Sequence, residues 1–436
     1  MKLFDWSLKV RGYDIAFAKA HLSQIQSIPE AAYEQHIAEQ KERIVAYHKK
    51  NTPFYRELLG DKPISNWNEI PILTKKDLQQ PLEKRLSNQY TKSSVYINKT
   101  SGSSGHPFVF AKDKACHALT WAVIQDRFGW YDLDFNSSLQ ARFYGIPLDG
   151  MGYYKERLKD SMSSRYRFPI FNLDEEALEE ILKTFSKKKF EYLNGYTSSI
   201  VLFAKYLSKQ NIILKEVCPS LKTCVVTSEM LFEDDRKLLE KQFQVPVINE
   251  YGASELDLIA FQNLEGHFQI NNETLFVEIV DTNNKVVPLG TEGRIIVTAL
   301  YNQGHPFIRY DIGDIGVLSK KSTSKKPILE KLIGRTSDIA KLPSGKIVPG
   351  LTFYYVTKSA IQDSGDITEF VVRQTQLDTF EIDYVGEHTL SRKQTQEIQK
   401  AIDTYLEPGL HIIFNKFEKI DRQKSGKLKQ FTSLTR

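Results

Sequence analysis

The sequence predicts an α/β protein with a large N-terminal domain of mixed sheets and helices and a small α+β C-terminal domain. Three observations lead to this prediction. Short apolar runs alternate with helical stretches from about residue 95, two strand-like runs flank a turn within residues 275–300, and a separate pattern of strands and one helix follows residue 335. The 436 residues also exceed one average domain. We therefore expect domains at 1–334 and 335–436.

The elements can be placed from periodicity and turn residues. A helical hairpin is expected within residues 30–60, where apolar positions recur among charged ones until Asn51-Thr52-Pro53. Further along the large domain, we expect helical stretches at 174–185 and 192–206 and strands at 95–97, 223–226, 275–280 and 294–300. In the small domain, we expect strands at 367–374, 379–385 and 411–415, and an amphipathic helix that carries Ile398, Ala401, Ile402 and Tyr405.

Composition restricts the class of partner and the compartment. The formal net charge is only +5 and the lysines are scattered, so a nucleic-acid partner is not expected. Cys116, Cys218 and Cys224 show no CxxC spacing, which favours a reducing compartment. No segment approaches about 18 uninterrupted apolar residues, and the charged start is unlike a signal peptide. We expect a cytoplasmic protein without a membrane span.

A Ser/Gly-rich segment is the first candidate for chemistry. Residues 100–107 read Thr-Ser-Gly-Ser-Ser-Gly-His-Pro and follow a strand-like run. Glycines allow close backbone approach, and hydroxyl and N–H groups can surround a polyphosphate. The segment lacks the Gly-Lys-Ser/Thr ending of a Walker loop. Taken alone, a Ser/Gly cluster is more often a flexible turn.

A second candidate follows the apolar run 245–248. The sequence Asn-Glu-Tyr-Gly-Ala-Ser-Glu at 249–255 places Tyr251, Ser254 and Glu255 on a loop that leaves a strand. Loops of this kind carry ligand sites in α/β sheets. The competing interpretation of the segment alone is a helix start with Ser254 as its cap.

Three further residues suit a nucleotide site, although each also fits an ordinary loop. Asp314 could accept hydrogen bonds from both ribose hydroxyls, and Arg335, at the expected domain junction, suits sugar or phosphate oxygens. Lys427 follows a glycine in a polar tail, where the alternative is simply a solvated terminus.

Together and in this order, these segments resemble the adenylate-forming superfamily of acyl-CoA synthetases. The closest resemblance is to the phenylacetate-CoA ligase family, in a branch that includes capsular polysaccharide biosynthesis proteins and deazaflavin-nucleotidylating synthetases. Residues 51–55, 70–78 and 342–346 are similar to that branch, so the resemblance covers nearly the whole chain. It implies an AMP-forming acid:CoA ligase that uses ATP, Mg²⁺ and coenzyme A.

The resemblance also implies a role for each motif residue. Tyr251 would stack on adenine, Ser254 would contact the α-phosphate and Glu255 would hold Mg²⁺. Asp314 would bind the ribose hydroxyls, and Lys427 would neutralise charge between the acid carboxylate and the α-phosphate. The residues implied to contact ATP are Thr100, Ser101, Gly102, Ser103, Ser104, Gly105, Ser228, Glu229, Tyr251, Gly252, Asp314 and Arg335.

The acid pocket is expected at Tyr144, Tyr196 and Ser198, because residues 193–198 look like the family's segment that lines this site. An aromatic or other small acid is the expected substrate. The alternative is a helix start capped by Ser198 or Thr197, with Tyr196 in the core.

One departure from the family pattern leaves the acceptor open. Ser337 occupies the usual acidic hinge position and Asp338 follows it. The alternative function is therefore adenylation with transfer to a non-CoA acceptor, or nucleotidyl transfer, in polysaccharide or cofactor biosynthesis. A non-catalytic binding protein that retains the fold is a third possibility, and a homodimer is one possible assembly.

Overall fold

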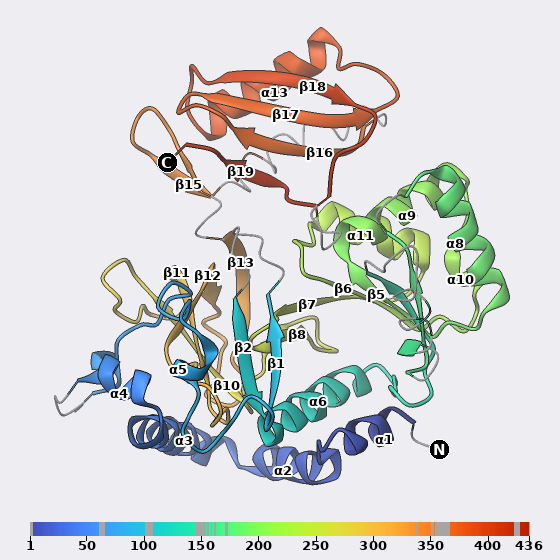
Figure 1. Cartoon of the computed structure of the whole chain (residues 1–436). Helices are drawn as coiled ribbons and strands as arrows, with labels where there is room; N and C mark the ends of the chain where they lie inside the picture. Colours follow the sequence, from blue (N-terminus) through green and yellow to red (C-terminus); the bar gives the residue numbers. More distant parts are fainter. Residues whose placement is uncertain are drawn as a thin grey trace. The chain divides into compact units, whose positions relative to one another are not determined.

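The computed structural model describes residues 3–60, 66–100, 108–144, 154, 157, 159–160, 163–170, 173–335, 339–349, 353, 367–422 and 428–435 (Figure 1). The chain divides into two compact units. The first contains residues 1–312 and 316–331, and the second contains residues 313–315 and 332–436. Which unit binds ATP and the acid remains a prediction.

The N-terminal part of the first unit is helical. The helices are α1 (Leu3–Val10), α2 (Ile15–Ser27), α3 (Glu30–Asn51), α4 (Pro53–Leu59), the 3₁₀ turn η1 (Trp67–Glu69) and α5 (Leu82–Arg85). Helix α2 begins where the side chain of Asp14 accepts a hydrogen bond from the Phe17 amide, and Pro53 separates α4 from α3. The helical pair predicted within residues 30–60 is found as α3 and α4, while α1 and α2 were not predicted.

A seven-stranded sheet forms the centre of the first unit. Its strand order is β4-β3-β5-β6-β7-β8-β9. Strands β4, β3, β5, β6 and β7 are parallel to one another, and β8 and β9 pair antiparallel at the end of the sheet. The bounds are β3 (Gln140–Phe143), β4 (Arg165–Phe168), β5 (Tyr192–Tyr196), β6 (Thr223–Thr227), β7 (Val247–Ala253), β8 (Asp257–Gln262) and β9 (Phe268–Ile270).

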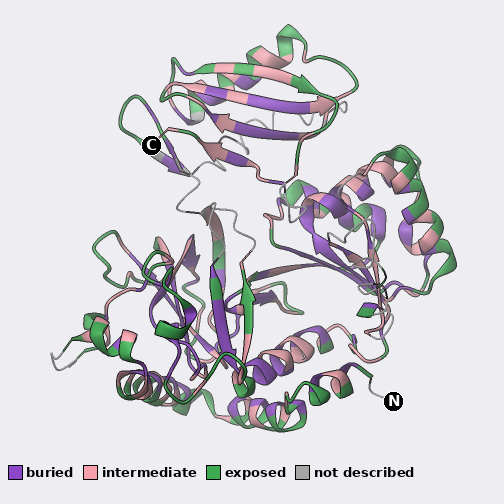
Figure 2. Cartoon of the chain, viewed as in Figure 1, coloured by how far each residue is buried: buried purple, intermediate pink, exposed green. Residues whose placement is uncertain are grey.

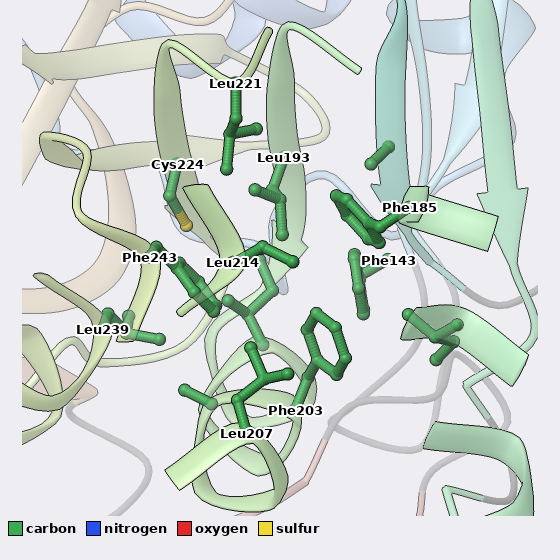
Figure 3. Packing of buried hydrophobic residues seen from close by; sticks show 14 of the residues in the cluster. Phe143, Phe185, Leu193, Phe203, Leu207, Leu214, Leu221, Cys224, Leu239 and Phe243 are labelled. Atoms are coloured by element: carbon green, nitrogen blue, oxygen red, sulfur yellow. The ribbon is translucent and has the colours of Figure 1, made fainter. Parts of the chain in front are cut away.

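Helices cover both faces of this sheet, which explains the apolar character of its strands. Every residue of β5 and β6 is buried, as Figure 2 shows. One face packs against α8 (Glu175–Lys187), α9 (Thr197–Lys209), α10 (Leu214–Val217) and α11 (Glu233–Phe243), through the cluster in Figure 3. The other face packs against α1, α2 and α6 (Lys114–Gly129). The stretch predicted as helical at 192–206 is wrong in its first part, because residues 192–196 form β5.

A hairpin and a second sheet provide further strands, and residues 313–315 and 332–335 of that sheet belong to the second unit. Strands β1 (Val95–Lys99) and β2 (Val109–Asp113) pair antiparallel. The four-stranded sheet has the order β10-β11-β12-β13, with bounds Leu275–Val280, Glu292–Ala299, Tyr310–Leu318 and Leu329–Arg335. Strands β10 and β11 pair antiparallel, so the strand pair predicted at 275–300 is confirmed.

The second unit has its own sheet and core. Strands β16 (Ile367–Gln374), β17 (Thr379–Gly386), β18 (His411–Phe417) and β19 (Phe431–Ser433) form a sheet in the order β18-β17-β16-β19. Helix α13 (Arg392–Tyr405) packs on it through Ile398 and Ile402. A small hairpin, β14 (Ile339–Lys341) with β15 (Ile347–Pro349), precedes this sheet. The predicted strands and amphipathic helix of this region are confirmed.

Within the described part of the chain, no helix combines the length and the apolar character that crossing a bilayer requires.

Candidate active site

The carboxyl edge of the parallel strands gathers several of the predicted site residues. Tyr144 follows β3, Tyr196 ends β5, Ser228 follows β6 and Tyr251 lies near the end of β7. These strands are neighbours in the sheet, although their residues are far apart in the sequence. Ligands of open α/β sheets bind at this edge, because the loops that follow parallel strands meet there.

The segment at 251–255 forms the tight connection between β7 and the antiparallel β8. A Cβ atom at Gly252 would lie 2.3 Å from the carbonyl oxygen of Asp257, so only glycine permits this approach of the two strands. Tyr251 is buried and Ser254 is exposed in the turn. The alternative interpretation of Ser254 as a helix cap is wrong, because the chain returns as a strand.

Glu255 is the buried carboxylate of this turn. Glu255 is only 7% exposed, and its Oε1 accepts a hydrogen bond of 2.9 Å from the hydroxyl of Tyr310. Lys112 of β2 is also buried and forms an ion pair with Asp257, two residues after Glu255. Burial lowers the pKa of Lys112 to about 8, while the nearby Cys116 and Glu255 act in the opposite direction. The turn is therefore fixed by two contacts, from Tyr310 to Glu255 and from Lys112 to Asp257.

A small cavity adjoins this turn. Its volume is about 20 Å³, and Lys112, Cys116, Glu255 and Asn302 are among its lining residues. This is room for about one water molecule. The cavity is too small for a nucleotide.

The side chains at this turn could hold Mg²⁺ only together with a bound nucleotide. Among the described residues, no three His, Cys, Asp or Glu side chains form a metal-binding group. In nucleotide sites, Mg²⁺ is commonly held by one or two carboxylates together with phosphate oxygens and water. The single carboxylate of Glu255 fits that arrangement, so Mg²⁺ binding here would depend on the nucleotide.

Of the Ser/Gly-rich segment at 100–107, the structure describes only Thr100, and it describes Phe108, which follows the segment. The Thr100 amide donates to the Phe108 carbonyl at 2.9 Å, and the Phe108 amide donates to Thr100 Oγ1 at 3.0 Å. These two bonds continue the β1–β2 hairpin and close the base of the loop. Ser101, Gly102, Ser103, Ser104 and Gly105 lie outside the described residues.

The segment after β6 is tied to the start of α9. Ser228 is exposed and has a φ of 71°, a left-handed conformation that turns the chain sharply. Glu229 Oε2 accepts a hydrogen bond of 2.7 Å from the Ser198 amide, and Thr197 Oγ1 donates to the Glu229 carbonyl at 3.2 Å. A carboxylate at a helix N-terminus satisfies free amides and is favoured by the helix dipole. This contact joins Glu229, which is predicted to contact ATP, to the predicted acid-pocket segment.

The alternative interpretation of residues 196–198 is correct in part. Helix α9 does begin at Thr197, and Tyr196 is buried with an exposed fraction of 8%. The capping group is wrong, however, because the N-cap residue is Tyr196 and makes no side-chain capping bond. The carboxylate of Glu229 supplies this bond from a distant segment.

Tyr144 and Tyr196 lie against each other. Their ring centroids are 4.8 Å apart with an interplanar angle of 55°, and the Tyr144 hydroxyl donates to Asn194 Oδ1 at 3.4 Å. Burial raises the pKa of both phenols, so both are neutral at physiological pH. The structure thus brings together two of the predicted acid-pocket residues, and the half-buried Ser198 starts the adjoining helix.

The remaining predicted residues belong to the second unit. Asp314 lies on β12 and is 7% exposed, and the backbone of Arg335 ends β13. Lys427 lies outside the described residues. Their predicted roles therefore remain predictions.

Two residues of the site were not predicted. Tyr310 lies just before the Asp311–Asp314 segment that suggested a ribose site, and Lys112 stands in the strand Val109–Asp113 next to buried Phe110 and Ala111. A lysine inside an apolar strand is the signal that could have identified Lys112, because burial of an unpaired ammonium is costly.

Known proteins resemble this chain over most of its length. No protein-family model matches it. Protein CapK of Staphylococcus aureus is 29% identical over 318 residues, which cover 68% of this chain and 66% of CapK, just under two thirds of that protein. A phenylacetate-coenzyme A ligase of Thermus thermophilus is 22% identical over 344 residues, which cover 75% of each protein.

Solved structures show the fold. A 2-hydroxyisobutyryl-CoA ligase in the postadenylation state, in complex with R3-HIB-AMP, matches 93% of this chain and 90% of its own with a TM-score of 0.73 at 15% identity. The anthranilate CoA ligase AuaEII in complex with anthranoyl-AMP matches 78% of this chain and 66% of its own with a TM-score of 0.55 at 16% identity. The predicted resemblance and fold class are confirmed: the homologues include CapK and a phenylacetate-CoA ligase, and the fold is that of adenylate-forming CoA ligases.

Proposed function

We propose that this chain is an AMP-forming ligase that uses ATP to activate an aromatic or other small carboxylic acid as its acyl-adenylate and then transfers the acyl group to coenzyme A. The observation that carries the proposal is Glu255, a buried carboxylate fixed by Tyr310 at the turn after β7, in a fold shared with CoA ligases. A buried carboxylate of this kind is costly to maintain unless a cation compensates it.

In this proposal, the carboxyl edge of the sheet binds the nucleotide. Tyr251 stacks on adenine, with Gly252 beside it and residues Ser228 and Glu229 on the other side. The exposed hydroxyl of Ser254 contacts the α-phosphate, and the loop from Thr100 to Gly105 covers the β- and γ-phosphates. Mg²⁺ held by Glu255 would supply positive charge to the phosphate oxygens.

The first step joins the acid to AMP. A carboxylate oxygen of the acid attacks the α-phosphorus of ATP, a new O–P bond forms, and the bond to pyrophosphate breaks. Both reactants are anionic, so the rate depends on positive charge placed where the transition state develops negative charge. Lys427 is the proposed source of that charge, and Asp314 with Arg335 positions the ribose.

The second step transfers the acyl group. The thiol of coenzyme A loses its proton to solvent, its sulfur attacks the acyl carbon to form the thioester, and AMP leaves with the electron pair of the broken C–O bond. The phenylacetate-coenzyme A ligase relative supports this acceptor, at 22% identity.

A second candidate is transfer of the acyl group to an acceptor other than coenzyme A, or nucleotidyl transfer, in polysaccharide or cofactor biosynthesis. Two observations favour it. CapK is more similar to this chain than the coenzyme A ligase is, at 29% against 22% identity. Ser337 also replaces the usual acidic residue at the hinge.

Hydroxylamine trapping separates these proposals. Aromatic, fatty and sugar acids are incubated with ATP, Mg²⁺ and hydroxylamine, and the hydroxamate and AMP are quantified with and without coenzyme A. Hydroxamate formation from one acid class supports adenylation, and thioester formation when coenzyme A replaces hydroxylamine supports the coenzyme A acceptor. Hydroxamate without thioester favours acyl transfer to another acceptor, and absence of both hydroxamate and AMP with every acid contradicts acid activation by either route.

The proposed setting follows from the reactants. ATP and coenzyme A are both available in the cytoplasm, so we place the enzyme there, without nucleic-acid partners. A homodimer is a proposal that sedimentation of the full chain tests.

A further inference from the structure

Three arginine side chains share one face of the sheet beside the proposed acid pocket. Strands β3 and β4 are parallel, with Arg142 opposite Arg167 and Gln140 opposite Arg165. Side chains alternate between the two faces of a strand, so Arg142, Arg165 and Arg167 all project from the same face. Neighbouring strands are about 4.8 Å apart, so the Arg142 and Arg167 side chains leave the sheet from adjacent positions.

One buried carboxylate compensates only part of this charge. Asp160 is 2% exposed, and its Oδ1 accepts from Arg165 Nε at 2.6 Å and from Arg167 Nη2 at 3.0 Å. Arg142 takes no part in these bonds. Its guanidinium carbon lies 4.3 Å from the centre of the Tyr144 ring, and its buried Nε has no hydrogen-bond partner among the described residues.

Glu250 is a second acid whose charge interacts with Arg142. It lies in the middle of β7 and is hydrogen bonded by Thr227. Burial raises the pKa of Glu250, and Arg142 acts in the opposite direction. Burial and the charges of Arg142 and Arg167 lower the pKa of Arg165, whereas Asp160 raises it. The arginines are thus close enough to repel one another.

Such a cluster favours an anion. Arginine keeps its proton at physiological pH, so this repulsion cannot be relieved by deprotonation. The planar guanidinium binds a carboxylate or a phosphate through two parallel hydrogen bonds, and a desolvated pair of this kind is stronger than an exposed one. An anion that reached Arg142 would supply the partner its Nε lacks.

The cluster adjoins the residues proposed to hold the acid. Arg142 lies two residues before Tyr144 and stacks on its ring. On the neighbouring strand, Arg142 is opposite Asn194, which binds the Tyr144 hydroxyl and lies two residues before Tyr196. Burial raises the pKa of Tyr196, and the charges of Arg142 and Arg167 lower it. The positive charge of Arg142 therefore acts on both Tyr144 and Tyr196.

We propose that the acid activated by this enzyme carries a second anionic group, a carboxylate or a phosphate, and that Arg142 binds this group, with Arg165 and Arg167 adding positive charge beside it. This inference rests on the proposed function, because it concerns the acid of the same reaction. One carboxylate of the substrate reacts with ATP, and the second anionic group remains unchanged through both steps. Acids with a single charge would lack the partner for Arg142.

Matched pairs of acids test the inference on the unmodified protein. Each pair differs by one anionic group: phenylacetate and 4-carboxyphenylacetate, butanoate and butanedioate, propanoate and 3-phosphonopropanoate. The third pair distinguishes a phosphate-like group from a second carboxylate. In ATP-pyrophosphate exchange, we expect kcat/KM to be at least about tenfold higher for the doubly charged member of the preferred pair.

Variants assign this preference to Arg142. Arg142→Gln should lower kcat/KM for the doubly charged acid by about 10- to 100-fold, mainly through KM, and change the singly charged acid little. Arg142→Lys keeps the positive charge but lacks the planar guanidinium that forms two parallel hydrogen bonds, so its kcat/KM for the doubly charged acid should fall less. Arg11→Gln, at an exposed position in the same unit, is the matched control and should change neither. Thermal unfolding of each variant identifies any loss of folded protein.

The outcomes separate this inference from the proposed function. Equal use of both members of every pair, or an equal loss on both members in Arg142→Gln, would overturn the inference and leave the adenylation proposal standing. If Arg142→Gln does not fold, the preference of the unmodified protein still decides. Absence of exchange with every acid would overturn the proposed function, and the inference with it.

Discussion

The hydrogen bond between Tyr310 and Glu255 gives the most specific prediction for the site. Tyr310→Phe removes only the hydroxyl that donates to Glu255 Oε1 at 2.9 Å and leaves a buried carboxylate with one bond fewer. Hydrogen bonds to charged groups contribute about 1.5–3 kcal/mol. If Glu255 must hold its position in the transition state, the loss corresponds to a rate reduction of roughly 10- to 150-fold at about 1.4 kcal/mol per tenfold.

The matched control is Tyr131→Phe, which removes a hydroxyl that donates to the Gln262 carbonyl at 2.8 Å away from the proposed site. Both variants are compared by acid-dependent ATP-pyrophosphate exchange and by urea unfolding. We expect Tyr131→Phe to lower stability by about 1 kcal/mol and to leave exchange unchanged. Equal exchange rates in Tyr310→Phe, Tyr131→Phe and the unmodified protein would refute the assignment of Glu255 to the site.

Three further predictions concern residues outside this contact. Asp314→Ala should weaken ATP binding by about 1.5–3 kcal/mol per ribose hydrogen bond, measured by titration calorimetry, and an unchanged affinity would remove Asp314 from the ribose site. Lys427→Ala should lower ATP-pyrophosphate exchange by about a hundredfold with little change in ATP affinity. Lys424→Ala and Lys429→Ala should behave like the unmodified protein. Equal rates in all three variants would show that Lys427 is an ordinary solvated residue of the tail. Burial lowers the pKa of His48 from 6.5 to about 4. Between pH 4 and 6.5 the unfolded chain therefore binds more protons than the folded protein. The free energy of unfolding should fall by about 3 kcal/mol as the pH is lowered from 6.5 to 4. His48→Gln should remove this part of the acid destabilisation in urea unfolding at the two pH values, and an identical pH dependence would contradict the buried neutral histidine.

Much of the fold could be predicted because local patterns agree with tertiary burial. The strand at 223–226 was correct since both faces of β6 are covered and the run is therefore apolar throughout. The same property caused the error at 192–206, where a buried strand is followed directly by a buried helix. A continuous apolar run does not distinguish these states.

The site could be predicted only as a set of motifs. The bond between Glu229 and the Ser198 amide joins residues 31 positions apart, and no periodicity indicates it. Similarly, Arg142 and Arg167 occupy paired positions only because β3 and β4 are neighbours in the sheet. Such contacts depend on strand order, which the sequence pattern does not specify.

The most direct test of the central claim is exchange of labelled pyrophosphate into ATP, in the presence and absence of the acid, for the unmodified protein, Glu255→Gln and Glu265→Gln. Glu265 is the matched control, since its side chain is 77% exposed in the β8–β9 connection. We predict acid-dependent exchange that falls by about a hundredfold or more in Glu255→Gln and is unchanged in Glu265→Gln. Exchange that does not depend on an acid, or that is the same in both variants, would contradict the assignment of this chain as an adenylate-forming ligase with Glu255 at its centre.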